Sequence, residues 1–266
     1  MKNEGFVSLD QGDIFFKVSE GEPEFPILFI HGAGGDSNLF EKQLSGLEDK
    51  KLSFAIDLPG HGKSYAAEAP PLNSFVNAVT GFIRTLGLSN VVLAGHSMGS
   101  GILFELFNSM PDKISGLIFI SAGVSLPVNK MIFDLIDSDF SGFCNLTAQF
   151  SLSESAGDDI KTLMRDGLIK AGATTVKNDF RICDAYDYRD LIKQIDIPVL
   201  ILLNEKDKMI SGKIIQELHD GIPSSKLIRY PMKGHMPHWE NSGQVNSDII
   251  EFVSSLEPVE YEDEDE

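Results

Sequence analysis

Cysteine is scarce in this chain of 266 residues, because only Cys144 and Cys183 are present. The two match neither a metal-binding spacing nor a disulfide framework, so we interpret both as small buried residues in a reducing compartment. Residues 1–5 lack the apolar core of a signal peptide, and no apolar run approaches the roughly 20 residues that span a bilayer. We therefore expect a cytoplasmic protein with no membrane partner.

Basic residues are also few. Lys and Arg number 22 against 40 Asp and Glu, which gives a formal net charge of −18. Acidic residues crowd residues 257–266, a like-charge block that we expect to be a disordered tail. The negative surface repels phosphate backbones, which argues against a nucleic-acid partner. We expect a small-molecule substrate and a monomer or dimer.

The sequence does contain a regular alternation of β-branched runs with helical segments. This alternation predicts an α/β fold, in which a mostly parallel sheet has helices on both faces. The predicted strands are 6–9, 13–18, 27–30, 53–56, 91–94, 117–121, 199–203 and 227–230, and the predicted helices are 38–47, 72–86, 97–110, 212–219 and 242–256.

The alternation stops between Gly123 and about Asp187, where no strand-like run occurs. A connection of roughly 60 residues is too long for an ordinary loop, so we expect a separate helical layer. It would lie over the carboxyl edge of the sheet, where open α/β sheets bind ligands. The expected organisation is a core in residues 1–124 and 188–256, a helical cap in 125–187 and the tail in 257–266.

The most informative segment is Gly95-His96-Ser97-Met98-Gly99, which directly follows a predicted strand. A G-x-S-x-G sequence at a strand-to-helix turn holds the serine in a strained conformation with its hydroxyl exposed above the sheet. Gly95 and Gly99 are expected where strand and helix approach too closely for a Cβ. The Met98 amide would then lie at a helix N-terminus, where it can stabilise an oxyanion.

A nucleophilic serine needs a base, and the base needs a third group that orients it. Asp207 and His235 each follow a predicted strand, at the sheet edge that carries Ser97. Glu205 is an alternative acid and His238 an alternative base. We favour His235 because the preceding glycine frees the loop to turn the imidazole inward. An Asp after a strand is often only a turn residue, so its position alone does not assign it.

A second oxyanion donor is expected from the glycine-rich loop that follows the predicted strand 27–30, and we select the Ala33 amide. We interpret Asp57 and His61 as residues that brace loops, and His31 as a satisfied core histidine.

Candidate pocket residues are Gly32, His96, Phe133, Phe140 and Phe143. We also interpret His96 as a histidine near the core. The three phenylalanines favour an apolar acyl or alcohol group, but they are equally suited to packing the cap onto the core.

Taken together, the chain resembles the α/β-hydrolase superfamily in its capped, carboxylesterase-like serine-hydrolase branch. The resemblance rests on HGAG at 31–34, DLPGHGKS at 57–64, GHSMG at 95–99, IPVL to Asp at 197–207 and GHMPHWE at 234–240. It implies an eight-stranded sheet with Ser97 as nucleophile, His235 as base, Asp207 as its orienting group and the Ala33 and Met98 amides as the oxyanion hole. It implies no metal and no organic cofactor.

The chain departs from many members of the superfamily at Asn204, where they have glycine. Branches that use an aspartate nucleophile, the haloalkane dehalogenases and epoxide hydrolases, are disfavoured by the serine. The default expectation is ester hydrolysis through an acyl-enzyme. Lactone, thioester, amide and carbon–carbon bond cleavage use the same machinery and stay open.

Two other classes also stay open. A hydrolase-fold receptor with little turnover would share the same three residues. A dinucleotide-binding oxidoreductase is imitated by residues 32–37 with Asp57 after the next strand, but Ser37 stands where that fingerprint needs Gly or Ala.

Overall fold

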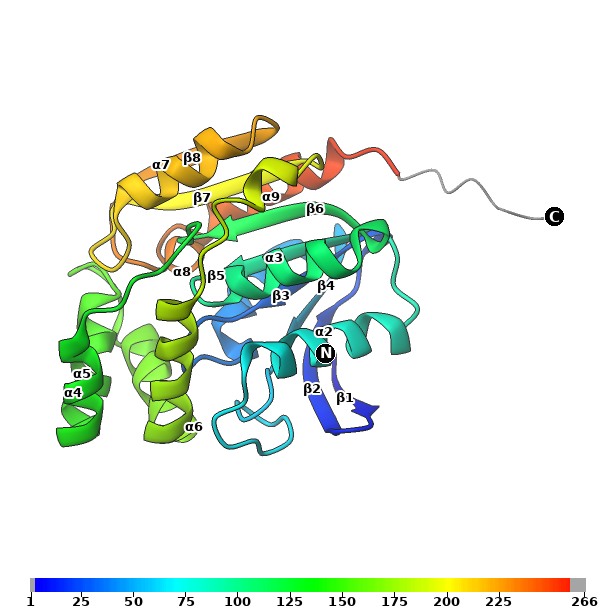
Figure 1. The fold of residues 1–266 in the computed structure, drawn as a ribbon. Helices are drawn as coiled ribbons and strands as arrows, with labels where there is room; N and C mark the ends of the chain where they lie inside the picture. Colours follow the sequence, from blue (N-terminus) through cyan, green and yellow to red (C-terminus); the bar gives the residue numbers. More distant parts are fainter. Residues whose placement is uncertain (1–2, 259–266) are drawn as a thin grey trace.

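A computed structural model describes residues 3–258, so most of the expected disordered tail lies outside the described residues. Eight strands form one sheet in the order β1-β2-β4-β3-β5-β6-β7-β8 (Figure 1). The β1–β2 and β2–β4 pairs are antiparallel and the other five are parallel. The strands are β1 Asn3–Leu9, β2 Gly12–Ser19, β3 Glu22–Ile30, β4 Lys51–Ile56, β5 Val91–His96, β6 Ile114–Ile120, β7 Val199–Lys206 and β8 Ser225–Lys233. All eight predicted strands are present.

Alternate residues of the central strands enter two different hydrophobic layers. In β5, Val91 and Leu93 pack into one layer, and Val92 and Ala94 pack into the other. Both faces of the strand are therefore buried, which is why its sequence is continuously apolar.

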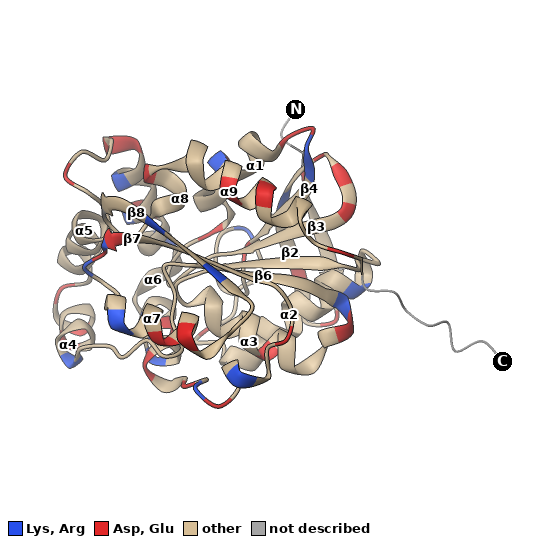
Figure 2. Cartoon of the chain, turned by 90° about the horizontal axis from the view of Figure 1, so that it is seen from above, with Lys and Arg blue, Asp and Glu red and all other residues tan. Residues whose placement is uncertain are grey.

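Helices cover both faces of the sheet (Figure 2). One face packs against α2 Leu72–Thr85, α3 Gly99–Ser109 and α7 Gly212–Gly221, and the opposite face packs against α1 Glu41–Leu47, α8 Pro237–Glu240 and α9 Ser242–Ser254. Short 3-10 helices occur at Ser37–Phe40, Pro111–Lys113 and Ile192–Gln194. None of the described helices is long and apolar enough to cross a bilayer.

Residues 125–187, called the insert below, lie between β6 and β7 and hold α4 Lys130–Ser138, α5 Phe140–Phe150 and α6 Asp158–Ala185. The three helices lie beside one another at one end of the sheet (Figure 1). An isolated β-bridge joins Ser125 to Asp187, where the insert leaves and re-enters the core. Gly172, with φ of 82°, interrupts α6 with a kink.

Two predicted helices begin differently from the observed ones, and the other three differ only at their last residues. The helix expected over 97–110 starts at Gly99, because Ser97 has a left-handed φ of 50°. The helix expected over 38–47 is a 3-10 turn followed by α1, because Phe40, with φ of −111° and ψ of 15°, leaves helical geometry.

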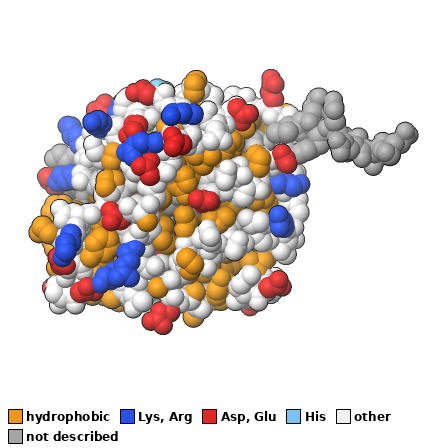
Figure 3. Space-filling view, viewed as in Figure 1, with side chains coloured by type: hydrophobic (Ala, Val, Ile, Leu, Met, Phe, Trp, Pro, Cys, Tyr) orange, Lys and Arg blue, Asp and Glu red, His pale blue; other side chains and the backbone are white. Residues whose placement is uncertain are grey.

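Acidic, basic and hydrophobic side chains are interspersed on the face drawn in Figure 3.

Candidate active site

The turn between β5 and α3 has the strained geometry that the sequence predicts. Ser97 adopts a φ of 50°, which is uncommon for a residue with a side chain. A Cβ on Gly99 would lie 2.6 Å from the carbonyl oxygen of Ile30, and one on Gly95 would lie 2.8 Å from the Gly99 backbone. Only glycine therefore fits at the two flanking positions, and the crossing of strand and helix holds Ser97 in place.

Asp207 and His235 form a hydrogen-bonded pair. Asp207 Oδ2 lies 2.8 Å from His235 Nδ1, and both side chains are almost completely buried. The other oxygen, Oδ1, accepts the backbone amides of Met209 at 2.7 Å and Ile210 at 3.2 Å. Burial by itself would raise the pKa of Asp207, but the His235 charge and these hydrogen bonds outweigh it and hold the pKa below its ordinary value. The carboxylate is thus ionised and fixed against the imidazole.

Ser97 and His235 line one cavity of about 480 Å³ between the core and the insert. Its walls are mostly apolar, and they include Leu126, Ile132, Phe143, Phe150, Met209 and Ile210. Lys208 is the one charged side chain among the described residues that line it. Such a cavity suits a small molecule with a substantial apolar group.

The candidate pocket residues fall into different places. Phe143 lines the cavity, and Phe140 stacks on it at a ring distance of 6.1 Å but belongs to the insert's own core. Phe133 is half-buried on α4, and neither it nor Phe140 is among the described residues that line the cavity. A Cβ on Gly32 would lie 3.1 Å from the Ser97 Cβ, so the loop of residues 31–35 passes directly beside the serine.

The two residues expected to donate to the oxyanion, Met98 and Ala33, belong to the two segments that meet at Ser97. Met98 is the N-cap residue of α3, so its amide lies at the positive end of that helix. Ala33 follows Gly32 in the loop beside the serine and lines a second cavity of about 30 Å³. Thr147 lines both cavities, which places the second one next to the first.

The remaining histidines separate into distinct structural roles. Leu58 donates its amide to His31 Nε2 at 3.1 Å, and His31 Nδ1 lies 2.8 Å from the Gly32 carbonyl, so His31 is a satisfied core histidine as predicted. Burial lowers the pKa of His31 and keeps the ring neutral. His238 is fully buried with neither ring nitrogen bonded to a described residue, and burial followed by the His235 charge lowers its pKa to about 3. His235, rather than His238, therefore carries the carboxylate partner.

Asp57 braces the loops around the sheet edge. Its carboxylate accepts the amides of Ser37 and Lys63, each at 2.7 Å. Asp36 caps the following 3-10 turn through the Asn38 amide at 2.9 Å. Both Asp57 oxygens accept backbone amides and the residue is only 2% exposed, so this acid does not face solvent, where the dinucleotide alternative requires it to bind a ribose.

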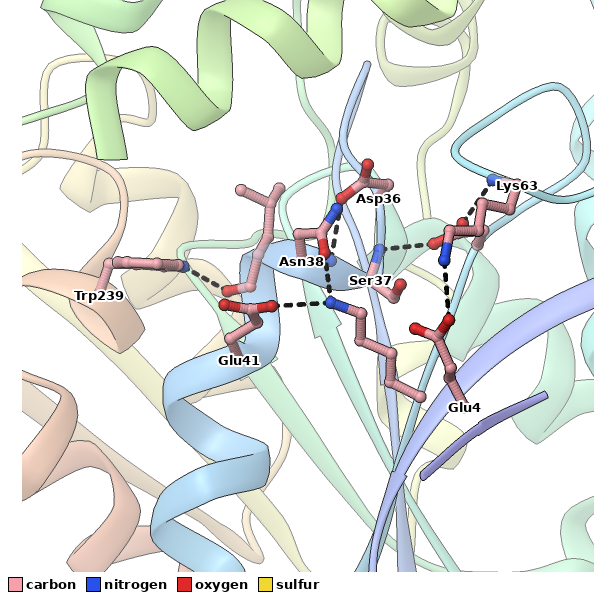
Figure 4. Close-up of polar contacts among 10 residues, drawn as sticks. Glu4, Asp36, Ser37, Asn38, Glu41, Lys63 and Trp239 are labelled. Atoms are coloured by element: carbon pink, nitrogen blue, oxygen red, sulfur yellow. Dashed lines mark hydrogen bonds and ion pairs between the residues drawn. The ribbon is translucent and has the colours of Figure 1, made fainter. Parts of the chain in front are cut away.

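Polar contacts fasten the 3-10 turn to neighbouring elements in the same region (Figure 4). Lys17, from β2, donates to the Asn38 side chain and to Glu41 at 2.8 Å. Trp239, from α8, donates its indole N–H to the carbonyl oxygen of Leu39. The turn that follows the glycine-rich loop is therefore held from both sides.

Sequence reasoning missed a polar bridge behind His235. Asn204 donates from Nδ2 to the Gly234 carbonyl and to Glu240 Oε2, both at 3.2 Å. Glu240 Oε1 in turn accepts the amide of Ser153 from the insert at 2.7 Å. Asn204, which lies near the end of β7 where many superfamily members have glycine, thus joins the strand that leads to Asp207 to the loop that carries His235. The departure at Asn204 and the acid that ends GHMPHWE were the available signals.

Comparison with known proteins shows the family to which the chain belongs. The model of the α/β hydrolase fold family matches residues 26–165, more than half of the chain. An AB hydrolase superfamily protein of Bacillus subtilis is 27% identical over 248 residues, which cover 86% of this chain and 92% of that protein. The chain belongs to the α/β-hydrolase fold family and is an α/β-hydrolase.

Two further similarities cover nearly the whole chain. A bifunctional esterase/perhydrolase of Acinetobacter calcoaceticus is 27% identical over 285 residues, covering 94% of this chain and all of that protein (100%). The structure of an esterase from Exiguobacterium antarcticum superposes with a TM-score of 0.87 at 20% identity, covering 94% of this chain and 99% of that one. The second similarity concerns the fold alone.

Proposed function

We propose that the protein hydrolyses small carboxylic esters, with Ser97 as nucleophile, His235 as general base and Asp207 as the group that orients the base. The observation that carries the proposal is the 2.8 Å pair of Asp207 and His235 beside a cavity that His235 shares with the strained Ser97. The esterase activity in the name of the Acinetobacter relative supports the same bond type.

The reaction proceeds in two steps. Because Asp207 accepts the Nδ1 proton, the neutral ring of His235 presents its lone pair at Nε2. His235 takes the Ser97 proton as the hydroxyl oxygen attacks the ester carbonyl, and the Ala33 and Met98 amides stabilise the oxyanion. The alcohol leaves with that proton. Water, deprotonated by His235, then attacks the acyl-enzyme, and the acid is released with Ser97 restored.

We further propose that the insert acts as a cap that selects the substrate, because Phe143 and Phe150 give the cavity apolar walls. An ester with an apolar acyl or alcohol group satisfies these walls, and the chemistry needs no metal or organic cofactor. The free, buried cysteines Cys144 and Cys183 support a cytoplasmic location.

The test is hydrolysis of p-nitrophenyl esters of increasing acyl length by the purified protein. We expect turnover that Ser97→Ala abolishes and that Ser109→Ala, an exposed position on α3, leaves unchanged. After treatment with a fluorophosphonate, mass spectrometry should show the phosphonyl group attached to Ser97, with fluoride lost as the leaving group. A single turnover that leaves a stable adduct would instead favour the receptor alternative, and cleavage of lactones in preference to every open ester would reassign the bond.

A further inference from the structure

A single buried carboxylate of the insert reaches the glycine-rich loop beside Ser97. Asp179, on α6, has no exposed surface. Its Oδ2 accepts the backbone amide of Gly34 at 2.8 Å and lies 2.9 Å from His61 Nε2. One oxygen atom therefore joins three segments: the insert, the loop of residues 31–35 and the loop that carries His61.

The two contacts of His61 fix the number of protons that the pair holds. Its Nδ1 lies 3.0 Å from the carbonyl oxygen of Pro59, which can only accept, so Nδ1 carries a proton. A further proton lies between Nε2 and Asp179. Burial alone would lower the pKa of His61, but the Asp179 charge and hydrogen bond outweigh it and raise that pKa. The arrangement is a buried imidazolium–carboxylate pair.

Stability alone does not account for such a pair. A buried ion pair is often no more stabilising than apolar residues of the same volume, because both charges lose their hydration. The second Asp179 oxygen, Oδ1, is buried without a hydrogen-bond partner among the described residues, which adds to the cost. The contacts that only a polar side chain can supply here are those to the Gly34 amide and to His61.

The Gly34 amide belongs to the residue after Ala33. Gly34 has a left-handed φ of 65°, and a Cβ on it would lie 2.4 Å from Leu168 and 3.2 Å from Val176, both in α6. Apolar contacts from α6 thus press on the loop, while the hydrogen bond to Asp179 fixes the direction of its peptide.

We propose that Asp179 is a positioning residue of the reaction, which holds the Gly34 amide and the His61 ring so that the Ala33 amide points at the oxyanion. This inference rests on the proposed ester hydrolysis. Through Asp179, the geometry of the oxyanion hole depends on where the insert lies. The insert therefore contributes to the chemical step as well as to substrate choice.

The test is Asp179→Asn, assayed with p-nitrophenyl butyrate. The neutral amide of the variant cannot balance the positive charge of His61, so the imidazole ring loses its Nε2 proton. The Nε2 lone pair then either faces the amide oxygen, which repels it, or forces the amide side chain to rotate. We expect kcat to fall by about tenfold to hundredfold, since small displacements of a catalytic donor have effects of this order, while KM stays within about twofold. The inhibition constant of phenylboronic acid should rise in parallel with the loss of kcat/KM, because its tetrahedral adduct on Ser97 places an oxygen in the oxyanion position.

Two matched variants give the comparison. Asp166→Asn makes the same change at an exposed position of α6 and should leave every parameter unchanged. Val176→Ala loosens the fully buried packing of the same helix without removing a hydrogen bond. If Asp179→Asn and Val176→Ala lose thermal stability and kcat alike, with the boronic acid bound equally well by both, Asp179 has only a structural role and the inference is overturned.

His61→Gln tests the pair from its other side, which keeps the inference testable if Asp179→Asn does not fold. Gln retains a side-chain N–H but no charge, and the Gly34 contact is left in place. We expect a fall in kcat smaller than that of Asp179→Asn, again with weaker boronic acid binding, and unchanged values in a folded His61→Gln protein would count against the inference. An inactive wild-type protein would overturn the proposed function first, which separates the two failures.

Discussion

The side chain of His96 donates from Nε2 to the backbone carbonyl of His235 across 3.0 Å. The two rings lie 4.7 Å apart at their centres. His96 precedes Ser97 in the chain, so the residue next to the proposed nucleophile holds the backbone of the proposed base. Its other nitrogen, Nδ1, is buried without a hydrogen-bond partner among the described residues, so the bond to the His235 carbonyl is the one hydrogen bond that the ring makes to them.

Replacing His96 should therefore affect the chemical step more than substrate binding. In His96→Ala the His235 carbonyl loses its donor, and we expect kcat to fall by about tenfold with little change in KM. His96→Gln can still donate from its amide nitrogen and should recover most of the rate. Steady-state kinetics with one ester decides the matter, and equal activity in the two variants would contradict the positioning role.

The activity should depend on pH through the pair of His235 and Asp207. Protonated His235 cannot accept the Ser97 proton, so kcat/KM should fall on the acid side. Because the pKa of Asp207 is lowered, this carboxylate stays ionised through the whole range in which histidines titrate. A pH–rate profile without any fall on the acid side would contradict the assignment of His235 as the base. Asp207→Asn should lower kcat by roughly 10,000-fold, as expected when a histidine loses its orienting carboxylate.

Stability should depend on pH through His61 and Asp179. The folded-state pKa of His61 is raised, so the stabilisation is fully present below the ordinary histidine pKa and is lost as pH rises through the raised value. The Asp57 charge also raises the pKa of His61, and the centre of the neutral His31 ring lies 4.8 Å from that of the His61 ring. Burial and then the Asp179 charge raise the pKa of the Cys183 thiol.

The measurement is urea unfolding of wild type and Asp179→Asn between about pH 6 and 9. The difference in unfolding free energy should be largest at the acid end and should shrink toward the alkaline end. A difference that grows with pH would mean that the pair is not an imidazolium and a carboxylate.

A methyl group at Gly99 should disrupt the serine turn. Its Cβ would lie 2.6 Å from a backbone oxygen of β3, which cannot move away as a flexible side chain would. We expect Gly99→Ala to reduce the unfolding free energy by about 1–3 kcal/mol or more and to abolish activity. Gly243→Ala in α9, where nothing lies within 4 Å of the added Cβ, should be neutral or stabilising.

Phe150 offers a test of the apolar cavity wall. It lines the cavity although it is 55% exposed, so its removal should cost little stability. We expect Phe150→Ala to raise KM for long-chain esters by about five- to twentyfold and to leave short-chain esters nearly unchanged, because the lost contact is worth about 1–2 kcal/mol. Met131→Ala, at a 72% exposed position of α4, should have no effect on either. Equal KM changes for short and long esters would place the bound chain elsewhere.

The sheet was predictable because most of its strands are short apolar runs, and such a run can be recognised in the sequence without knowing which strand it pairs with. The Ser97 turn was predictable because the close approach of the backbones requires glycine at positions 95 and 99, and this requirement appears in the local sequence. The pairing of Asp207 with His235 followed from strand order, since both come after neighbouring strands β7 and β8.

Contacts that depend on the placement of the insert were not predictable. Asp179 is one of many acids in the chain, and nothing near it in sequence signals that it meets Gly34, 145 positions away. Phe133, Phe140 and Phe143 share one composition signal, but only the helix orientation decides that Phe143 reaches the cavity. Strand ends also shifted, because β3 begins at Glu22 in an exposed polar stretch that carries no apolar pattern.

Two single polar atoms of the insert accept backbone amides of the core loops on either side of Ser97. The Ser151 carbonyl accepts the amide of His235 at 2.6 Å, and Asp179 accepts that of Gly34. A segment transplanted from another family member would bring new walls for the substrate, and it would keep these two bonds only if it placed a backbone carbonyl and a carboxylate at the same two positions. Engineering of a new specificity in this scaffold is therefore best confined to side chains of α4 and α5, with both anchoring atoms kept in their present places.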